Sequence, residues 1–288
     1  NLNAYVGNGP VNAVDPTGLD GVTPELLEFY EQLRPAMNER LRALAAENAR
    51  REWARYRHQL PSASELEEAL MYTRLAAGAY ALVKGDICAG WTVEHVETYK
   101  SNYGYRAVLY HRMEDGTNQY VLAFAGTDMF QIPDWIASAE QAVGKLTDQY
   151  VAAHGGASKW AARYGKENLH LVGHSLGGGL AASAAIVNGL HATTFNPAGV
   201  HESARYRNRE NWARRNELIT AYCVFGEVLT HFQNDFWLIR DVLPNTTGRR
   251  IVLRLGREAD RVERHLTAAI EEALRLAYRT VAGRWPDQ

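Results

Sequence analysis

A serine between glycines is the residue of this chain best suited to chemistry. Ser175 is the middle residue of Gly-His-Ser-Leu-Gly at 173–177, which fits the G-x-S-x-G pattern. The apolar run 169–172 before it has the length of a buried strand, and the small-residue segment 178–186 after it suits a helix packed closely on a sheet. At such a turn the serine adopts a strained backbone conformation, and the glycines leave room for strand and helix. The pattern predicts a nucleophile; the alternative is a glycine-rich turn with an incidental serine.

A serine nucleophile needs a general base. The histidines that follow Ser175 are His191, His201, His231 and His265. Enzymes with this turn supply their catalytic groups in the chain order serine, acid, histidine. His265 comes after the last expected strand, at the start of the last expected helix. We therefore expect His265 to be the base; the alternative is a surface histidine at a helix start.

The acid must lie between nucleophile and base, best placed just after a strand. Segment 218–225 reads as a strand, and Gly-Glu-Val follows it at 226–228. Glu227 is the acid that this order favours. Asp235, in the segment after it, and Asp241, before the loop at Pro244, remain alternatives.

Two backbone donors are expected to stabilise the oxyanion. One is the N–H of Leu176, directly after the nucleophile and at a helix N-terminus, which favours negative charge. The other is expected from the loop after strand 119–125, where Gly126 lets the backbone approach substrate and the Thr127 hydroxyl adds a donor.

Bulky apolar residues follow both the oxyanion loop and Glu227. They are Met129, Phe130, Phe232, Phe236 and Trp237. In the expected fold they would flank the site, where they could line an acyl pocket or touch a bilayer; the alternative is ordinary core packing.

Strand-like and helix-like segments alternate along most of the chain. The segment Ser62–Glu65 has the capping-box pattern and predicts a helix running to about residue 82. The expected strands are 91–99, 105–111, 119–125, 169–172, 192–195, 218–225 and 251–255, and the expected helices lie in 131–165, 178–186 and 261–278. This alternation predicts an α/β sheet covered on both faces.

These motifs resemble those of the class 3 (fungal-type) lipase family, which carries Phe-Arg-Gly-Thr/Ser, Asp-Trp and Gly-His-Ser-Leu-Gly-Gly. The matching segments are 124–127, 134–135 and 173–178, and the likeness covers about 62–279. It implies an α/β-hydrolase with a mostly parallel sheet that cleaves acylglycerol or phospholipid esters without a cofactor or metal. Ala125 replaces the family's Arg, and Glu227 stands where the family has Asp.

The first 19 residues differ in kind, being rich in Asn, Gly and Pro. They resemble the closing segment of the Rhs/YD-repeat core, with Tyr-Val-Gly-Asn-Gly-Pro at 5–10 and Asp-Pro-Thr-Gly-Leu at 15–19. In that family this segment separates a β-shell from a variable C-terminal toxin. The resemblance implies that Asp15 belongs to a self-cleaving motif and that a longer parent chain is cut after Leu19.

Three regions are therefore expected: the end of an Rhs core at 1–19, a charged helical extension at 20–61, and a lipase-like hydrolase domain at 62–288. The N-terminus lacks the signature of a signal peptide, and no run of 18 apolar residues exists. Cys88 and Cys223 are far apart and offer no disulfide framework or zinc spacing.

The charges argue against one class of function and leave two interpretations of one charged surface. A net charge of −2 argues against a nucleic-acid binder. Arginines crowd the last third, but acids are interleaved with them, which predicts an ion-paired surface. The alternative is a face for anionic lipid headgroups or an acidic protein.

Together the patterns predict a phospholipase A-type serine hydrolase, released as a toxin from an Rhs effector and acting at a target-cell membrane. The expected partners are membrane phospholipid as substrate, a cognate immunity protein and the Rhs shell of the parent chain. The alternatives are a peptidase, amidase or thioesterase on the same fold, and a non-catalytic interaction module.

Overall fold

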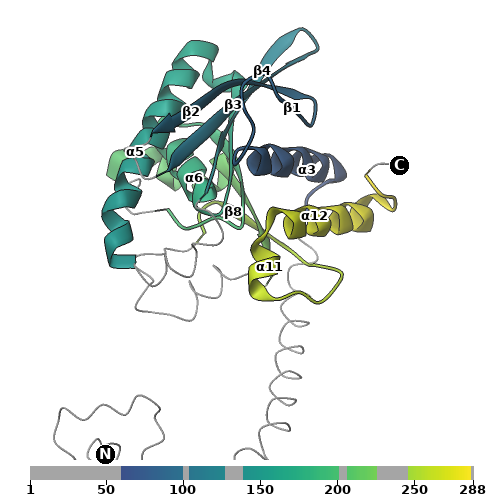
Figure 1. Cartoon of the computed structure of the whole chain (residues 1–288). Coiled ribbons are helices and arrows are strands. Elements are labelled where there is room, and N and C mark those ends of the chain that lie inside the picture. Colours follow the sequence, from purple (N-terminus) through teal and green to yellow (C-terminus); the bar gives the residue numbers. More distant parts are fainter. Residues whose placement is uncertain (1–59, 100–103, 127–138, 201–205, 226–245, 287–288) are drawn as a thin grey trace, which may run out of the picture. The chain divides into compact units, whose positions relative to one another are not determined.

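The computed structural model describes residues 60–99, 104–126, 139–200, 206–225 and 246–286 (Figure 1). The segment 1–19, with Asp15 and Leu19 of the predicted cleavage, lies outside them, as does most of the predicted extension 20–61. Residues 59–288 form one compact unit. Among the described residues, no helix has the length and apolar character needed to cross a bilayer.

A sheet of eight strands, ordered β1 to β8 as in the chain, forms the centre of the described part. The strands are β1 Ile87–Cys88, β2 Trp91–Tyr99, β3 Tyr105–Glu114, β4 Thr117–Phe124, β5 Leu169–His174, β6 His191–Phe195, β7 Ile219–Val224 and β8 Arg249–Leu253. Neighbours from β1 to β4 pair antiparallel, and those from β4 to β8 pair parallel. The parallel half carries the predicted nucleophile turn at the end of β5.

The helices of the described residues connect or cover these strands. They are α3 Ala63–Gly78, α5 Ala139–Tyr164, the 3-10 turn η4 Lys166–Asn168, α6 Leu176–Asn188, α8 Arg209–Ala213, α9 Arg215–Leu218, α11 Arg261–His265 and α12 Thr267–Ala282. The parallel strands advance in one direction across the sheet. Right-handed crossovers therefore place α5 and α6 on the same face.

The opposite face is covered by helices from outside these crossovers, α3 and α12, which lie side by side (Figure 1). Each face has its own apolar cluster, and β3 contributes to both. Val108 and Tyr110 join the cluster of α3 and α12, while Ala107 and Leu109 join that of α5 and α6. This is the period-2 alternation of a strand buried on both sides.

Helix α3 begins as predicted but ends earlier. The Ser62 hydroxyl accepts from the Glu65 N–H at 3.3 Å, and the Glu65 carboxylate accepts from the Ser62 N–H at 3.1 Å, so the capping box is confirmed. The helix stops at Gly78, not near residue 82. The Arg106 guanidinium on β3 binds the carbonyls of Ala79 and Leu82 and holds them away from a helical ladder.

The single final helix predicted over 261–278 is wrong, because the chain breaks at Leu266. This residue has an extended conformation, with φ −62° and ψ 148°, and separates α11 from α12. The break releases the carbonyl of His265, which accepts hydrogen bonds from His174 and Asn196 instead. His265 is therefore the last residue of a short helix and not the start of a long one.

Several arginines of the last third are paired, as the interleaved acids predict. Arg257 contacts Glu263 at 2.5 Å and Glu272 at 3.0 Å, and Arg249 contacts Glu65 at 2.6 Å. All of these groups are substantially exposed, so each pair contributes little to stability.

Candidate active site

Ser175 forms a strained turn between β5 and α6. Its φ of 58° and ψ of −127° lie in a region that non-glycine residues rarely adopt, at a cost of roughly 1–3 kcal/mol. Backbone hydrogen bonds hold it: the Ser175 N–H donates to the carbonyl of Phe195 at 3.0 Å, and its carbonyl accepts from Gly178 at 3.0 Å and Ala198 at 2.9 Å. The surrounding structure therefore imposes the conformation that the motif predicted.

The two glycines of the motif are required by space. A Cβ on Gly173 would lie 2.1 Å from the carbonyl oxygen of Gly177, and one on Gly177 would lie 2.1 Å from that of Phe124. Strand β5, helix α6 and the end of β4 therefore meet backbone to backbone around the serine.

His265 lies beside the predicted nucleophile. Its Nε2 is 2.9 Å from the Ser175 Oγ, and its side chain is fully buried at the end of α11. His191 is exposed at the start of β6, while His201 and His231 lie outside the described residues. Serine and histidine, distant in sequence, are thus within hydrogen-bond reach, as a general base requires.

His174, the second residue of the motif, contacts the backbone carbonyl of His265 through its side chain. Its Nε2 lies 2.7 Å from the carbonyl oxygen of His265, and its Nδ1 lies 3.1 Å from the Tyr80 hydroxyl. Since a carbonyl only accepts, Nε2 carries the proton, and Nδ1 accepts from Tyr80. Burial, with His265 nearby, lowers the pKa of His174 to about 3, so its ring is neutral at physiological pH.

Asn196 joins three elements directly after β6. It is buried with φ 41°, a left-handed conformation that asparagine tolerates. Its Nδ2 donates to the carbonyls of Arg264 at 3.0 Å and His265 at 3.1 Å, and its Oδ1 accepts from the Val224 N–H at 2.8 Å. Sequence reasoning missed Tyr80, His174 and Asn196; only His174, inside the motif, had a visible signal.

The predicted oxyanion donors are described in part. Leu176 begins α6, so its N–H is free of the helical ladder at the positive end of the helix dipole. A Cβ on Gly126 would lie 3.3 Å from the Leu176 nitrogen, which places the end of β4 beside this N–H. Thr127 lies outside the described residues.

The predicted acid, with its alternatives, and the predicted acyl-pocket residues are also outside the described part of the chain. They are Glu227, Asp235, Asp241, Met129, Phe130, Phe232, Phe236 and Trp237. The backbone leading to Glu227 is described as far as Phe225, whose N–H donates to Leu253 and whose carbonyl accepts from the Arg264 guanidinium at 3.0 Å.

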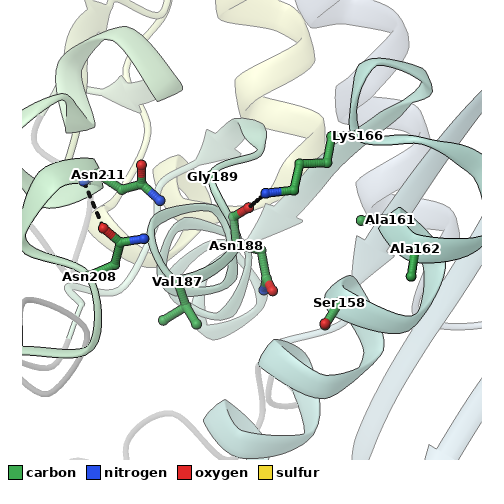
Figure 2. A pocket seen from close by; sticks show the side chains of 9 residues that line it. All are labelled: Ser158, Ala161, Ala162, Lys166, Val187, Asn188, Gly189, Asn208 and Asn211. Atoms are coloured by element: carbon green, nitrogen blue, oxygen red, sulfur yellow. Dashed lines mark hydrogen bonds between the residues drawn. The ribbon is translucent and has the colours of Figure 1, made fainter.

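A cavity of about 530 Å³ lies elsewhere, between α5, α8 and the end of α6 (Figure 2). Asn188 in its wall is the last residue of α6, whereas Ser175 caps the start, so about 20 Å of helix separates them. Its polar side chains serve the fold: Lys166 donates to the carbonyl of Asn188 at 2.6 Å, and Asn208 caps α8 (Figure 2). This cavity is not part of the Ser175 site. Within the described residues, no three histidine, cysteine or acidic side chains gather as a metal site would need.

A strained serine between a parallel strand and a tightly packed helix, in a sheet with helices on both faces, defines an α/β-hydrolase fold, as predicted. Sequence comparison then gives the family. The Tle-like phospholipase domain profile matches residues 75–273, and the chain belongs to this phospholipase-like family of ester hydrolases.

Individual proteins show narrower likeness. The extracellular phospholipase A1 of Serratia liquefaciens is 40% identical over 113 residues, 39% of this chain but only 33% of that protein. Among solved structures, the Rhizomucor miehei lipase propeptide complex overlaps 60% of this chain and 65% of its own at 16% identity, with a TM-score of 0.44. Lipase II from Rhizopus niveus overlaps 60% and 77% at 13% identity, with a TM-score of 0.40.

Proposed function

We propose that this chain is a phospholipase A-type serine hydrolase in which Ser175 is the nucleophile and His265 the general base. The observation that carries the proposal is the 2.9 Å contact between Ser175 Oγ and His265 Nε2 at a strained strand-to-helix turn. Membership of a phospholipase-like family supports a lipid ester as substrate. The extracellular phospholipase A1 of Serratia liquefaciens, similar over part of its length, supports the same substrate class.

The reaction would proceed in two steps. The Ser175 oxygen attacks the ester carbonyl while His265 takes its proton, and the Leu176 N–H with Thr127 stabilises the negative oxygen. His265 returns the proton to the leaving alcohol, a lysophospholipid, and the acyl group remains on Ser175. Water, deprotonated by His265, then releases the fatty acid and restores the serine.

We assign the third member to Glu227. The carbonyl of Phe225 is bound by the side chain of Arg264, the residue before the base. Two residues of chain span at most about 7 Å, so the backbone of Glu227 can lie no farther than that from Phe225. Asp235 and Asp241 are separated from it by far more chain. Met129, Phe130, Phe232 and Trp237 would line the acyl pocket.

Mass spectrometry of lipids exposed to the protein tests the function. Wild type should convert phospholipid to lysophospholipid and fatty acid, and Ser175→Ala, which loses one oxygen, should fold but not turn over. Ser175→Ala activity within about tenfold of wild type would contradict the nucleophile, since loss of a catalytic serine costs far more. A panel of short esters and amides separates an esterase from an amidase, and an active-site serine probe separates an enzyme from an interaction module.

The biological role that we propose is a toxin released from an Rhs effector and delivered to a target-cell membrane. The support is the sequence of residues 1–19. The longer parent chain should be cut after Leu19, with Asp15 in the self-cleaving motif. N-terminal sequencing of the released fragment should begin at Asp20; a start well inside 24–60 would contradict this assignment.

A toxic hydrolase requires protection of its producer, so we propose a small immunity protein that covers the site or the arginine-rich last third. Expression of the domain in the periplasm should be toxic, and co-expression of the neighbouring open reading frame should relieve the toxicity. Harmless expression of an active wild-type enzyme would argue against a toxin.

A further inference from the structure

The carbonyl oxygen of His265 is held by two side chains to which the mechanism above gives no role. His174 Nε2 donates to it at 2.7 Å and Asn196 Nδ2 at 3.1 Å. Both donors are buried, with 2% and 1% of their surface exposed, so solvent does not compete for the acceptor. Two buried hydrogen bonds on one oxygen fix the backbone of the base in position.

This anchoring matters because α11 cannot position His265 alone. The helix has five residues and is followed at once by the extended Leu266. A helix of this length has little stability of its own. The location of the imidazole therefore depends on what binds its backbone.

His174 ties that backbone to the nucleophile. It precedes Ser175 in the chain, and its side chain holds the carbonyl of the residue whose ring contacts the Ser175 oxygen. One covalent link and two hydrogen bonds close a loop through nucleophile and base. This loop ties the backbone position of His265 to that of Ser175.

Tyr80 extends the network to the oxyanion side. Its hydroxyl donates to His174 Nδ1 and so fixes the tautomer in which Nε2 carries the proton. The same oxygen lies 2.7 Å from where a Cβ of Gly126 would be, against the end of β4.

Asn196 extends the network to β7. Its Oδ1 accepts from the Val224 N–H, and its Nδ2 donates to the His265 carbonyl. One side chain therefore sets the distance between Val224 and the backbone of His265. Glu227 follows Val224 closely in the chain.

We propose that His174 and Asn196, with Tyr80 fixing the His174 tautomer, are positioning residues that hold the Ser175–His265 contact at reacting distance. They act through the His265 carbonyl and do not touch substrate. The inference rests on the proposed function, since it gives the catalytic use of this network.

The central test replaces the donor and keeps the volume. His174→Phe should lower kcat on a soluble p-nitrophenyl ester by roughly 10²-fold and change KM by less than about threefold, because a misplacement near 1 Å has this order of effect. Labelling of Ser175 by a fluorophosphonate should slow in parallel. His174→Gln, whose amide can donate at the position of Nε2, should recover much of the loss.

A matched control is His170→Phe. His170 lies four residues earlier on β5 and contacts Thr193 Oγ1 at 3.0 Å, so the change also removes one histidine hydrogen bond. It should leave kcat within about threefold of wild type, because it lies roughly 13 Å along the strand from His174. Urea unfolding of each variant checks that kcat is compared between folded proteins.

The outcomes separate the inference from the function. Full activity in Ser175→Ala would overturn both. An inactive Ser175→Ala with a folded His174→Phe whose kcat matches His170→Phe would overturn the inference alone. Where His174→Phe does not fold, Tyr80→Phe is the test variant. It removes only the hydroxyl that donates to His174, and loss of one hydrogen bond should lower kcat by about tenfold. An unchanged kcat in that variant would overturn the inference.

Discussion

Substitution of Gly177 by alanine should damage the site by widening it, not by removing a reacting group. An added Cβ would lie 2.1 Å from the carbonyl oxygen of Phe124, whereas real Cβ atoms essentially never approach a neighbour closer than 3.0 Å. The atoms that it meets belong to backbone at the end of β4, so no flexible side chain can move aside. The helix start and the strand end must separate.

The size of this separation determines the expected loss of turnover and of stability. Opening the contact from 2.1 Å to at least 3.0 Å moves the end of β4 relative to Leu176, between the two proposed oxyanion donors. A displacement near 1 Å at a reacting centre lowers turnover by roughly 10²-fold. Overpacking of this kind also destabilises a fold by about 1–3 kcal/mol.

The assay compares Gly177→Ala with Gly155→Ala. Gly155 is also helical, in α5, but no neighbouring atom lies within 4 Å of its Cβ position. Alanine there should leave kcat unchanged and stabilise the fold by up to about 1 kcal/mol, since glycine is a poor helix former. Urea unfolding and ester hydrolysis are measured on both variants. Equal kcat and equal stability in the two variants would refute the argument that residue 177 has no room for a Cβ.

Three further changes test other parts of the molecule. Burial lowers the pKa of His154 to about 4 from an ordinary 6.5. As pH falls through this range, the unfolded state binds the extra proton and the free energy of unfolding falls. His154→Gln should flatten the pH dependence of this free energy, measured by urea unfolding, by up to about 1.4 kcal/mol per pH unit, and an unchanged slope would contradict a neutral buried ring. Glu227→Gln should preserve the fold and lower turnover by roughly 10³–10⁴-fold, and Glu227→Asp should have a turnover between that of Glu227→Gln and that of wild type. A fully active Glu227→Gln beside an inactive Asp235→Asn or Asp241→Asn would show that Glu227 is not the acid. Ser62→Ala removes the cap of α3 and should cost about 1 kcal/mol in unfolding experiments; no change would show that the box contributes nothing.

Local sequence predicted the elements whose causes are local. The strand at 91–99 has the predicted bounds, and the elbow follows from glycines that leave no room for a side chain. The capping box likewise depends on residues three positions apart. Such features carry their own signal in the chain.

Features made by distant contacts were not predictable in this way. Leu266 is a good helix former with no glycine or proline beside it, yet the helix breaks there. Hydrogen bonds from His174 and Asn196 to the His265 carbonyl accompany the break. Tyr80 reaches His174 across 94 positions, and nothing in its neighbourhood marks it. The positioning network is tertiary throughout.

The pairing of α3 with α12 determines when the fold can be completed during synthesis. Arg74 meets Glu271 across 197 positions, and Tyr278 meets Glu67 across 211. During synthesis, the part of this sheet face that α12 covers beside α3 stays exposed until α12 has emerged from the ribosome, and the proposed base on α11 emerges just before it. Contacts of such long range close late and slowly. A partly made chain therefore holds Ser175 without His265, its proposed base, and the fold and the proposed activity are completed together.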